Sequence, residues 1–261
     1  NIYWYGVIIA AGMLLAVLYA FRNAVDYGID SDRLVDVVAI GTVMAIVCAR
    51  IYYVAMAPFA YQSLWEMIDI RKGGIAIYGA VIGAFVFGAL AAKWRKVPLL
   101  PLFDLVSLGF LIGQGIGRWG NFFNCEAFGG YTDNLFAMRI KESIVNPSMI
   151  SAGLLEHEIV ENGVKYIQVH PTFLYESCWN LCVLAFMLWY RKRKKFDGEM
   201  LWVYFLGYGL GRVWIEGLRT DQLKLPGTGL AVSQLLSAAL VGAAVGVLHY
   251  KHSKLKKQKN I

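Results

Sequence analysis

A long apolar run occupies residues 99–119 and reads LLPLFDLVSLGFLIGQGIGRW. A helix needs roughly 20 mostly apolar residues to cross the hydrocarbon core of a bilayer, and this run has that length and character. Gly109, Gly113 and Gly117 repeat along it at every fourth position, the spacing that lets two membrane helices pack closely. The run therefore predicts a membrane-spanning helix packed tightly against a neighbour.

Further apolar runs of similar length lie on both sides of this one. They occupy residues 3–21, 34–54, 75–92, 172–190, 200–218 and 229–249. The chain starts with Asn rather than Met, and we expect a few native residues to precede the first run. Of the 261 residues, 58% are hydrophobic and only 16% are charged, against about 45–50% and about 25% in soluble domains. This composition excludes an ordinary soluble globule and a disordered chain, and we predict an all-α polytopic membrane protein with seven transmembrane helices.

A polar segment, 121–170, separates the fourth and fifth runs. It contains short β-like pieces at 135–140 and 165–169, so we predict a small α+β insertion outside the membrane. The expected parts of the chain are therefore three. They are residues 1–120 with the first four helices, 121–170 with the head subdomain and its leading loop, and 171–261 with the last three helices and a basic tail.

The distribution of Lys and Arg predicts the orientation. Segments 22–33, 93–98, 191–198 and 250–261 would share one side of the membrane, and they hold most of these residues. The opposite side holds fewer, namely Arg71, Lys72, Arg139, Lys141, Lys165, Arg219 and Lys224. By the positive-inside rule the N-terminus is outside, the C-terminus is cytoplasmic and the insertion is extracytoplasmic. The net charge of +7 then reflects topology and attraction to the lipid bilayer, and we expect no binding to nucleic acid.

This orientation places polar side chains from five spans near the outer leaflet. They are Tyr5, Tyr78, Arg118, Asn121, Asn124, Glu126, His170, Tyr175, Glu176, Tyr208, Arg212, Glu216 and Arg219. A charged residue within a span costs about 2.5–3.5 kcal/mol on insertion scales, so Arg118 and Arg212 are functional candidates. For Arg50 we favour a structural explanation, in which it reaches the interface or pairs with a neighbouring acid.

The sixth run carries its polar residues on one face. Tyr208, Arg212, Glu216 and Arg219 follow the spacing of a single helical stripe. Arginine forks match phosphate oxygens, and the natural anion at this depth is a phospholipid head group. The residues alone therefore predict a phospholipid site, but they do not distinguish a lipid-modifying enzyme from a lipid transporter or an anion-conducting protein. A scaffold without catalysis would leave the arginines without a purpose.

The string GRWGNFFNCEAFGG at residues 117–130 resembles the signature of the prolipoprotein diacylglyceryl transferases, a family of bacterial inner-membrane enzymes. Three further segments agree in order: WYG at 4–6, HPTFLYE at 170–176 and GYGLGRVWIEGLR at 207–219. The resemblance covers the whole chain. We expect Gly120, Gly129 and Gly130, which flank the fourth span, to serve turns.

The resemblance implies an activity and two partners. The family transfers the diacylglyceryl group of phosphatidylglycerol to the lipobox cysteine of a prolipoprotein signal peptide, forming a thioether and releasing glycerol-1-phosphate. It implies no metal and no soluble cofactor. Matching of the motifs assigns phosphatidylglycerol binding to Tyr5, Arg118, Asn121, Asn124, Gly129, Tyr208, Arg212, Glu216 and Arg219.

The expected catalytic residues are Arg118, Arg212, Tyr78 and Glu126, with Glu126 placed to orient Arg118. Many family members have His where this chain has Tyr78, and Tyr at this place resembles the Gram-positive branch. Phe173 stands where Gln is common. The base that forms the thiolate stays open among Tyr78, Glu126, His170 and Glu216. His170 and Glu176 are each a possible base or a structural residue.

Overall fold

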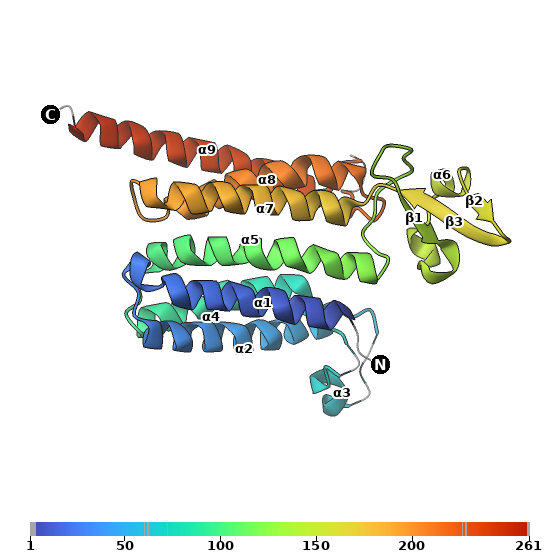
Figure 1. Ribbon diagram of the computed structural model, residues 1–261. Coiled ribbons are helices and arrows are strands. Elements are labelled where there is room, and N and C mark those ends of the chain that lie inside the picture. The colour runs from blue at the N-terminus through green and yellow to red at the C-terminus, as the bar shows by residue number, and fades with distance from the viewer. Residues whose placement is uncertain are drawn as a thin grey trace. The chain divides into compact units, whose positions relative to one another are not determined.

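The computed structural model describes residues 4–59, 61, 63–71, 73–225, 227 and 229–259. Lys72, one of the expected outer-side charges, lies outside the described residues. The described chain is mostly helical and carries one small sheet (Figure 1). Contacts divide it into two compact units, one formed by residues 1–20 with 103–261 and the other by 21–102.

Six helices in the described chain are long and apolar enough to cross a membrane. They are α1 (Trp4–Asn23), α2 (Ser31–Met56), α4 (Ile77–Trp94), α5 (Leu99–Phe123), α7 (Thr172–Tyr190) and α9 (Val232–Lys259). Each coincides with a predicted run, which confirms a mostly helical, multi-pass membrane protein. Helix α8 (Glu199–Leu218) matches the remaining run, but it is not one of the six because Arg212, Glu216 and several glycines lower its apolar character.

The helix ends differ from the predicted ends for local reasons. Helix α2 begins at Ser31 rather than at residue 34, because the side chain of Asp30 accepts a hydrogen bond from the backbone N–H of Arg33. Helix α9 continues past residue 249 to Lys259, since the Lys-rich tail consists of good helix formers. Single 3₁₀ turns follow two helices, at Val25–Tyr27 and Arg191–Arg193.

In the first unit, the glycines of α5 pack against α1 as their spacing predicts. A Cβ added at Gly117 would lie 3.3 Å from the side chain of Ile9, and one at Gly109 would lie 3.7 Å from Ala16. Gly12 of α1 meets the backbone of Gly113 in the same way. The expected neighbour of the fourth span is therefore the first.

Helices α7, α8 and α9 pack through a second set of glycines. Gly211 and Gly207 of α8 leave room for the side chains of Trp179 and Val183 on α7, and the Trp179 indole donates to the carbonyl of Gly207 at 2.8 Å. Gly209 faces Val241 of α9. Figure 1 shows α7 and α8 running side by side, with the basic end of α9 extending beyond them. The end of α5, the start of α7 and the end of α8 lie close together in this unit.

The second unit is built on α2 and α4, with the short helix α3 (Leu64–Ile68) between them. Gly79 and Gly83 of α4 approach the backbone of α2 around Cys48. The Arg50 guanidinium donates to four backbone carbonyls, those of Glu66, Met67, Gly73 and Gly74, at 2.6–3.1 Å. Arg50 therefore braces the backbone of this unit, and the neighbouring acid that was predicted as its partner is replaced by carbonyls.

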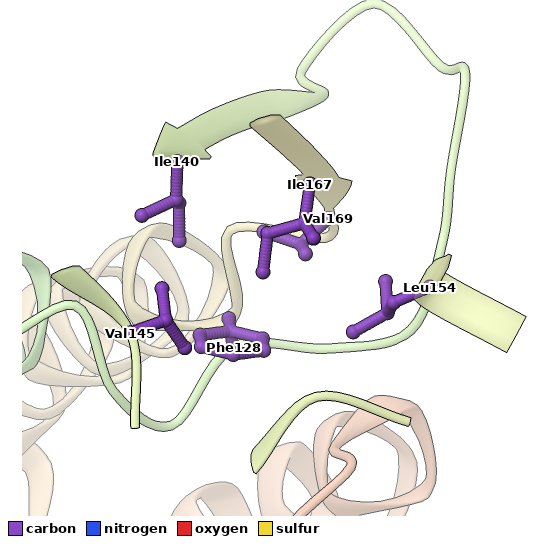
Figure 2. Packing of buried hydrophobic residues seen from close by; sticks show 6 residues of the cluster. All are labelled: Phe128, Ile140, Val145, Leu154, Ile167 and Val169. Atoms are coloured by element: carbon purple, nitrogen blue, oxygen red, sulfur yellow. The ribbon is translucent and has the colours of Figure 1, made fainter. Parts of the chain in front are cut away.

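The polar segment forms a three-stranded antiparallel sheet in the order β1-β3-β2, from β1 (Met138–Lys141), β2 (Ile159–Glu161) and β3 (Val164–Val169). Short helices accompany it at Glu142–Ile144, Pro147–Met149 and α6 (Ala152–Leu155). Figure 2 shows its small core, in which the side chains of Phe128, Ile140, Val145, Leu154, Ile167 and Val169 converge. The predicted α+β character of this segment is thus observed.

Two details of this segment differ from the prediction. The piece expected at 135–140 becomes a strand only from Met138, because the Asn134 side chain accepts from the backbone of Phe136 and holds a turn there. Strand β2 was not predicted. Asn162 and Gly163 both have positive φ, the conformation of a tight hairpin turn, and the Asn-Gly pair was a usable sequence signal for it.

Candidate functional site

A buried carboxylate joins the two arginines that the sequence singled out. Glu176, near the start of α7, is only 3% exposed. Its Oε2 lies 2.5 Å from Nε of Arg118 on α5, and its Oε1 accepts from Nη1 of Arg212 on α8 at 2.7 Å. The two guanidinium groups therefore share one carboxylate and lie in the same site.

A second carboxylate extends this network along α8. Glu216 pairs with Nη2 of Arg212 and accepts a hydrogen bond from the Ser233 hydroxyl at 2.6 Å. Arg219 lies 3.9 Å from both Glu176 and Glu216, and it forms a two-pronged pair with Asp221 at 2.7 and 2.9 Å. We call this set the arginine cluster; it consists of Arg118, Arg212, Arg219, Glu176, Glu216 and Asp221. Its three positive and three negative groups balance.

Asp221 lies outside the helices and responds to this network. Burial opposes its ionisation, but the hydrogen bond and charge of Arg219 outweigh burial and hold the pKa of Asp221 below its usual 3.8. Asp221 therefore stays ionised throughout the neutral and mildly acidic range.

The arginines of the cluster differ in how many of their guanidinium nitrogens contact a carboxylate. Arg212 directs both terminal nitrogens at carboxylates, and Arg219 directs two donors at Asp221. Nε of Arg118 lies closest to Glu176, and the Arg118 side chain is 22% exposed. Within the described residues, neither Nη1 nor Nη2 of Arg118 donates a hydrogen bond. The fork of Arg118 is therefore positioned by protein yet available to an anion.

The loop that follows α5 binds its own carboxylate. Glu126 accepts from the side-chain amides of Asn121 at 3.0 Å and Asn124 at 3.4 Å. The expected contact of Glu126 with Arg118 is absent from the described residues, where Glu176 takes that place. Glu126 instead closes the loop, in which Cys125 and Ala127 both adopt positive φ. The sequence prediction missed this because it used the distance along the chain, whereas Glu176 comes from another helix.

Gly129 connects this loop to the ends of two helices. Its N–H donates to the carbonyl of His170 at 2.9 Å, and the N–H of Gly130 donates to the carbonyl of Leu218 at 3.0 Å. A Cβ at Gly129 would lie 2.7 Å from Cβ of His170 and 2.8 Å from the Leu218 carbonyl oxygen. Gly129 and Gly130 have no positive φ, so the expected turn role is wrong for Gly129, which is needed for close approach.

Gly120 likewise serves close packing rather than a turn. It lies within helix α5, and a Cβ there would approach the Tyr5 ring at 2.8 Å. Tyr5 is thereby placed beside the end of α5, within the same unit as the arginine cluster. Tyr208 stacks on Tyr204 at 5.5 Å, on the same helix as Arg212. These contacts give both tyrosines a packing role alongside any contact with a ligand.

The candidate bases have different surroundings. Nδ1 of His170 lies 3.3 Å from the Tyr175 hydroxyl, and burial lowers the pKa of His170, so its imidazole is neutral at pH 7. Glu126 and Glu216 are occupied by amides or by Arg212 and Ser233. Tyr78 belongs to the other compact unit, where it is 57% exposed and contacts the Tyr52 ring.

Three residues of the site were missed or given too little weight. Asp221 and Ser233 were not predicted, although the short spacing from Arg219 to Asp221 was a usable signal. Glu176 was expected only as a base or a structural residue, yet it contacts two arginines. Over the described ranges, no group of three or more His, Cys, Asp or Glu side chains could hold a metal ion.

The apolar helices define a multi-pass membrane protein, and the arginine cluster joins buried charges from three of its helices. A family model described as prolipoprotein diacylglyceryl transferase matches residues 1–250, and the chain belongs to that family. The family consists of transferases.

Full-length relatives carry the same description. The phosphatidylglycerol–prolipoprotein diacylglyceryl transferase of Lysinibacillus sphaericus is 40% identical over 254 residues, covering 97% of this chain and 89% of that protein. The protein of that name from Clostridioides difficile is 37% identical over 262 residues, covering 100% and 94%. That of Geobacillus kaustophilus is 38% identical over 257 residues, covering 97% and 90%.

Proposed function

We propose that this chain transfers the diacylglyceryl group of phosphatidylglycerol to the thiol of a prolipoprotein lipobox cysteine in the bacterial plasma membrane. The family and the names of the relatives support the reaction. The observation that carries it in this chain is the Arg118 fork, held at Nε by Glu176 with both terminal nitrogens available. A guanidinium in this arrangement binds a phosphate through two parallel hydrogen bonds.

The proposed step is a substitution at carbon. The cysteine thiolate attacks the glycerol carbon that bears the phosphate, a carbon–sulfur bond forms and the carbon–oxygen bond breaks. Glycerol-1-phosphate leaves with the electron pair of that bond, and the base that ionised the thiol keeps its proton. Because negative charge concentrates on the leaving phosphate, donors aimed at it lower the barrier more than they stabilise the bound lipid.

Each remaining residue has a proposed role. Arg212 contributes its charge beside the phosphate and, with Arg219, holds Glu176 and Glu216 in place. Asn121 and Asn124, which close the loop on Glu126, bind the glycerol hydroxyls of the lipid. Gly129 sets the position of the loop, while Tyr5 and Tyr208 border the lipid. The thiol base is one of His170, Tyr78, Glu126 and Glu216.

We also propose the membrane arrangement that this reaction requires. Helix α8 crosses as a seventh span, since its charged residues pair within the protein rather than facing lipid. The N-terminus and the 121–170 head are outside, the C-terminus is cytoplasmic, and the arginine cluster lies near the outer leaflet. Residues 1–120, 121–170 and 171–261 then form successive parts along the chain.

The test uses purified protein, phosphatidylglycerol vesicles and a peptide with a lipobox cysteine. Wild type should release glycerol phosphate and form a thioether, whereas Arg118→Ala should lose about 10²–10³-fold in rate, the cost of removing one oxyanion donor. Arg139→Ala is a matched control, because Arg139 is an exposed head residue paired with Glu161. A lipid transporter would release no glycerol phosphate, and that result would refute the proposal.

The base is tested separately. Tyr78→Phe removes the phenol proton and leaves the ring. If the variant keeps wild-type activity, the phenol is not the base, and Tyr78→His should also be tolerated. His170→Gln, compared at pH 6 and pH 8, tests the imidazole by the shape of the pH profile.

A further inference from the structure

Two buried amide atoms lie one helical turn from the Arg118–Glu176 pair. Asn180 follows Glu176 by four residues on α7 and is only 2% exposed. Gln114 precedes Arg118 by four residues on α5, and its Nε2 donates to the Tyr204 hydroxyl at 2.9 Å. In the part of the chain that the structure describes, neither Nδ2 of Asn180 nor Oε1 of Gln114 has a hydrogen-bond partner.

The two amides occupy the same level of the helix bundle. Helices α5 and α7 run in opposite directions (Figure 1). They are in contact at this level, where the Ser177 hydroxyl donates to the carbonyl of Gly115 at 2.8 Å. A Cβ added to Gly115 would lie 3.9 Å from Cβ of Asn180. Gln114, one turn before Arg118 on α5, therefore lies at the same level as Asn180, one turn after Glu176 on α7.

Leaving these atoms without partners is costly. A buried donor or acceptor that makes no hydrogen bond costs about 1–3 kcal/mol, and native proteins keep few of them. Apolar side chains would fill this level without such a cost. The orphaned atoms thus indicate a polar ligand that reaches beneath the anion site and into the hydrocarbon zone.

We propose that Asn180, with Gln114 on the facing helix, binds the ester carbonyl oxygens of the diacylglycerol part of the donor lipid. This inference rests on the proposed function. When the phosphate lies on Arg118, the ester groups lie deeper in the bilayer by a few covalent bonds. That offset is comparable to the ~5.4 Å rise of one helical turn, which separates Asn180 from Glu176.

The chemistry of the two amides fits two ester carbonyls. A carbonyl oxygen only accepts, and Nδ2 of Asn180 only donates. The two ends of an amide are interchangeable in shape, so rotation of the Gln114 amide by half a turn presents Nε2 as a second donor. The Tyr204 hydroxyl then donates to Oε1 of Gln114 instead of accepting from Nε2. The subsite would recognise the ester linkage of the lipid rather than its acyl chain.

The test compares two donor lipids of matched chain length, diester phosphatidylglycerol and its dialkyl ether analogue, which lacks carbonyls. Wild type should show a roughly 5–30-fold higher kcat/KM for the diester, the value of one or two buried hydrogen bonds. Asn180→Leu should lower this ratio several-fold by reducing activity on the diester alone, while Gln114 retains the remaining preference. Ser177→Ala is the matched control on α7 and should affect both lipids equally.

The outcomes of this test separate failure of the ester subsite from failure of the proposed function. Equal rates of wild type on the two lipids, or an equal loss on both in Asn180→Leu, would overturn the subsite. If Asn180→Leu does not fold, the same ratio measured in Asn180→Ser and Gln114→Met decides instead. Absence of any wild-type activity on the diester lipid would refute the proposed function itself, which is a different outcome from an unchanged ratio.

Discussion

The two ends of α8 handle buried charge in opposite ways. At its start, Asp104 accepts from the backbone of Gly198 and Leu201 and from Lys194, at 2.9–3.2 Å. Glu199 there accepts from the hydroxyl of Tyr190 at 2.5 Å, contacts His252 Nε2 at 2.7 Å and accepts from nearby backbone N–H groups.

The arginine cluster at the other end of α8 leaves donors unused, namely both terminal nitrogens of Arg118. At the start of the helix, both oxygens of each carboxylate accept from donors, and the contacts fix where α8 begins. At the end, Arg118 is less buried, and its terminal nitrogens make no hydrogen bond within the described residues. The difference teaches that the number of unused donors, rather than the presence of buried charge, separates a binding site from a structural brace.

The largest expected effect is a difference in stability between variants of two arginines in the same cluster. Arg212→Ala removes one partner from each of two carboxylates, Glu176 and Glu216, and breaking a buried pair costs about 3–5 kcal/mol. Arg118→Ala leaves Arg212 on Glu176, so it should lose activity with a smaller drop in melting temperature. Both variants should lose at least about 10²-fold in rate in the glycerol phosphate assay. Equal melting temperatures, measured in detergent, would contradict this division of roles.

The next effect concerns the start of α8. Asp104→Ala leaves the N–H groups of Gly198 and Leu201 without their acceptor, which should cost about 1–3 kcal/mol of stability. The rate per folded molecule should stay at the wild-type value. The control is Asp197→Ala, because Asp197 is an exposed partner of Lys194 and such pairs contribute about 1 kcal/mol or less. A loss of turnover in folded Asp104→Ala protein would give this end a catalytic role.

A smaller effect tests adjacent glycines in the loop beside the cluster. Gly129→Ala forces a Cβ against His170 and the Leu218 carbonyl, and such overpacking costs about 1–3 kcal/mol. It should displace the loop and lower activity. Gly130→Ala meets nothing within 4 Å and should behave like wild type. Similar activities in the two variants would show that the close approach at Gly129 is not required.

The smallest effect is a dependence on pH. Burial lowers the pKa of His170, so the folded protein binds a proton there less readily than the unfolded chain. The stability contribution is complete above the ordinary value of 6.5 and is lost as the pH falls below it. The melting temperature should therefore fall from pH 7.5 to pH 5.5, and His170→Gln should flatten that slope. Asp221 cannot account for the slope, because its pKa lies below 3.8.

The sequence predicted much of the fold, because membrane spans follow from composition. The bounds of α7 agree with the run at 172–190, and the glycine repeat of α5 correctly indicated close packing. Helix ends were less predictable, since Asp30 extends α2 through a single side-chain hydrogen bond. The seventh span stays a proposal, because Arg212, Glu216 and the glycines make α8 less apolar than the six candidate spans.

The site was predictable in its residue types but not in its pairing. Arg118 and Arg212 follow from the cost of charge in a bilayer, and they do share one site. Their common partner, Glu176, depends on how α5, α7 and α8 pack, which no local pattern encodes. The same limit explains Gly129, whose neighbours His170 and Leu218 come from distant parts of the chain.

The balance of charge in the arginine cluster bears on turnover. Three guanidiniums face three carboxylates, so the charges of the cluster sum to zero. A phosphodiester brings one negative charge, whereas a phosphate monoester carries nearly two at neutral pH. In the proposed reaction the departing monoester is the less compensated of the two, and repulsion from Glu176 and Glu216 favours its release once the carbon–oxygen bond has broken. A more cationic cluster would hold the lipid more firmly and then be inhibited by its own product.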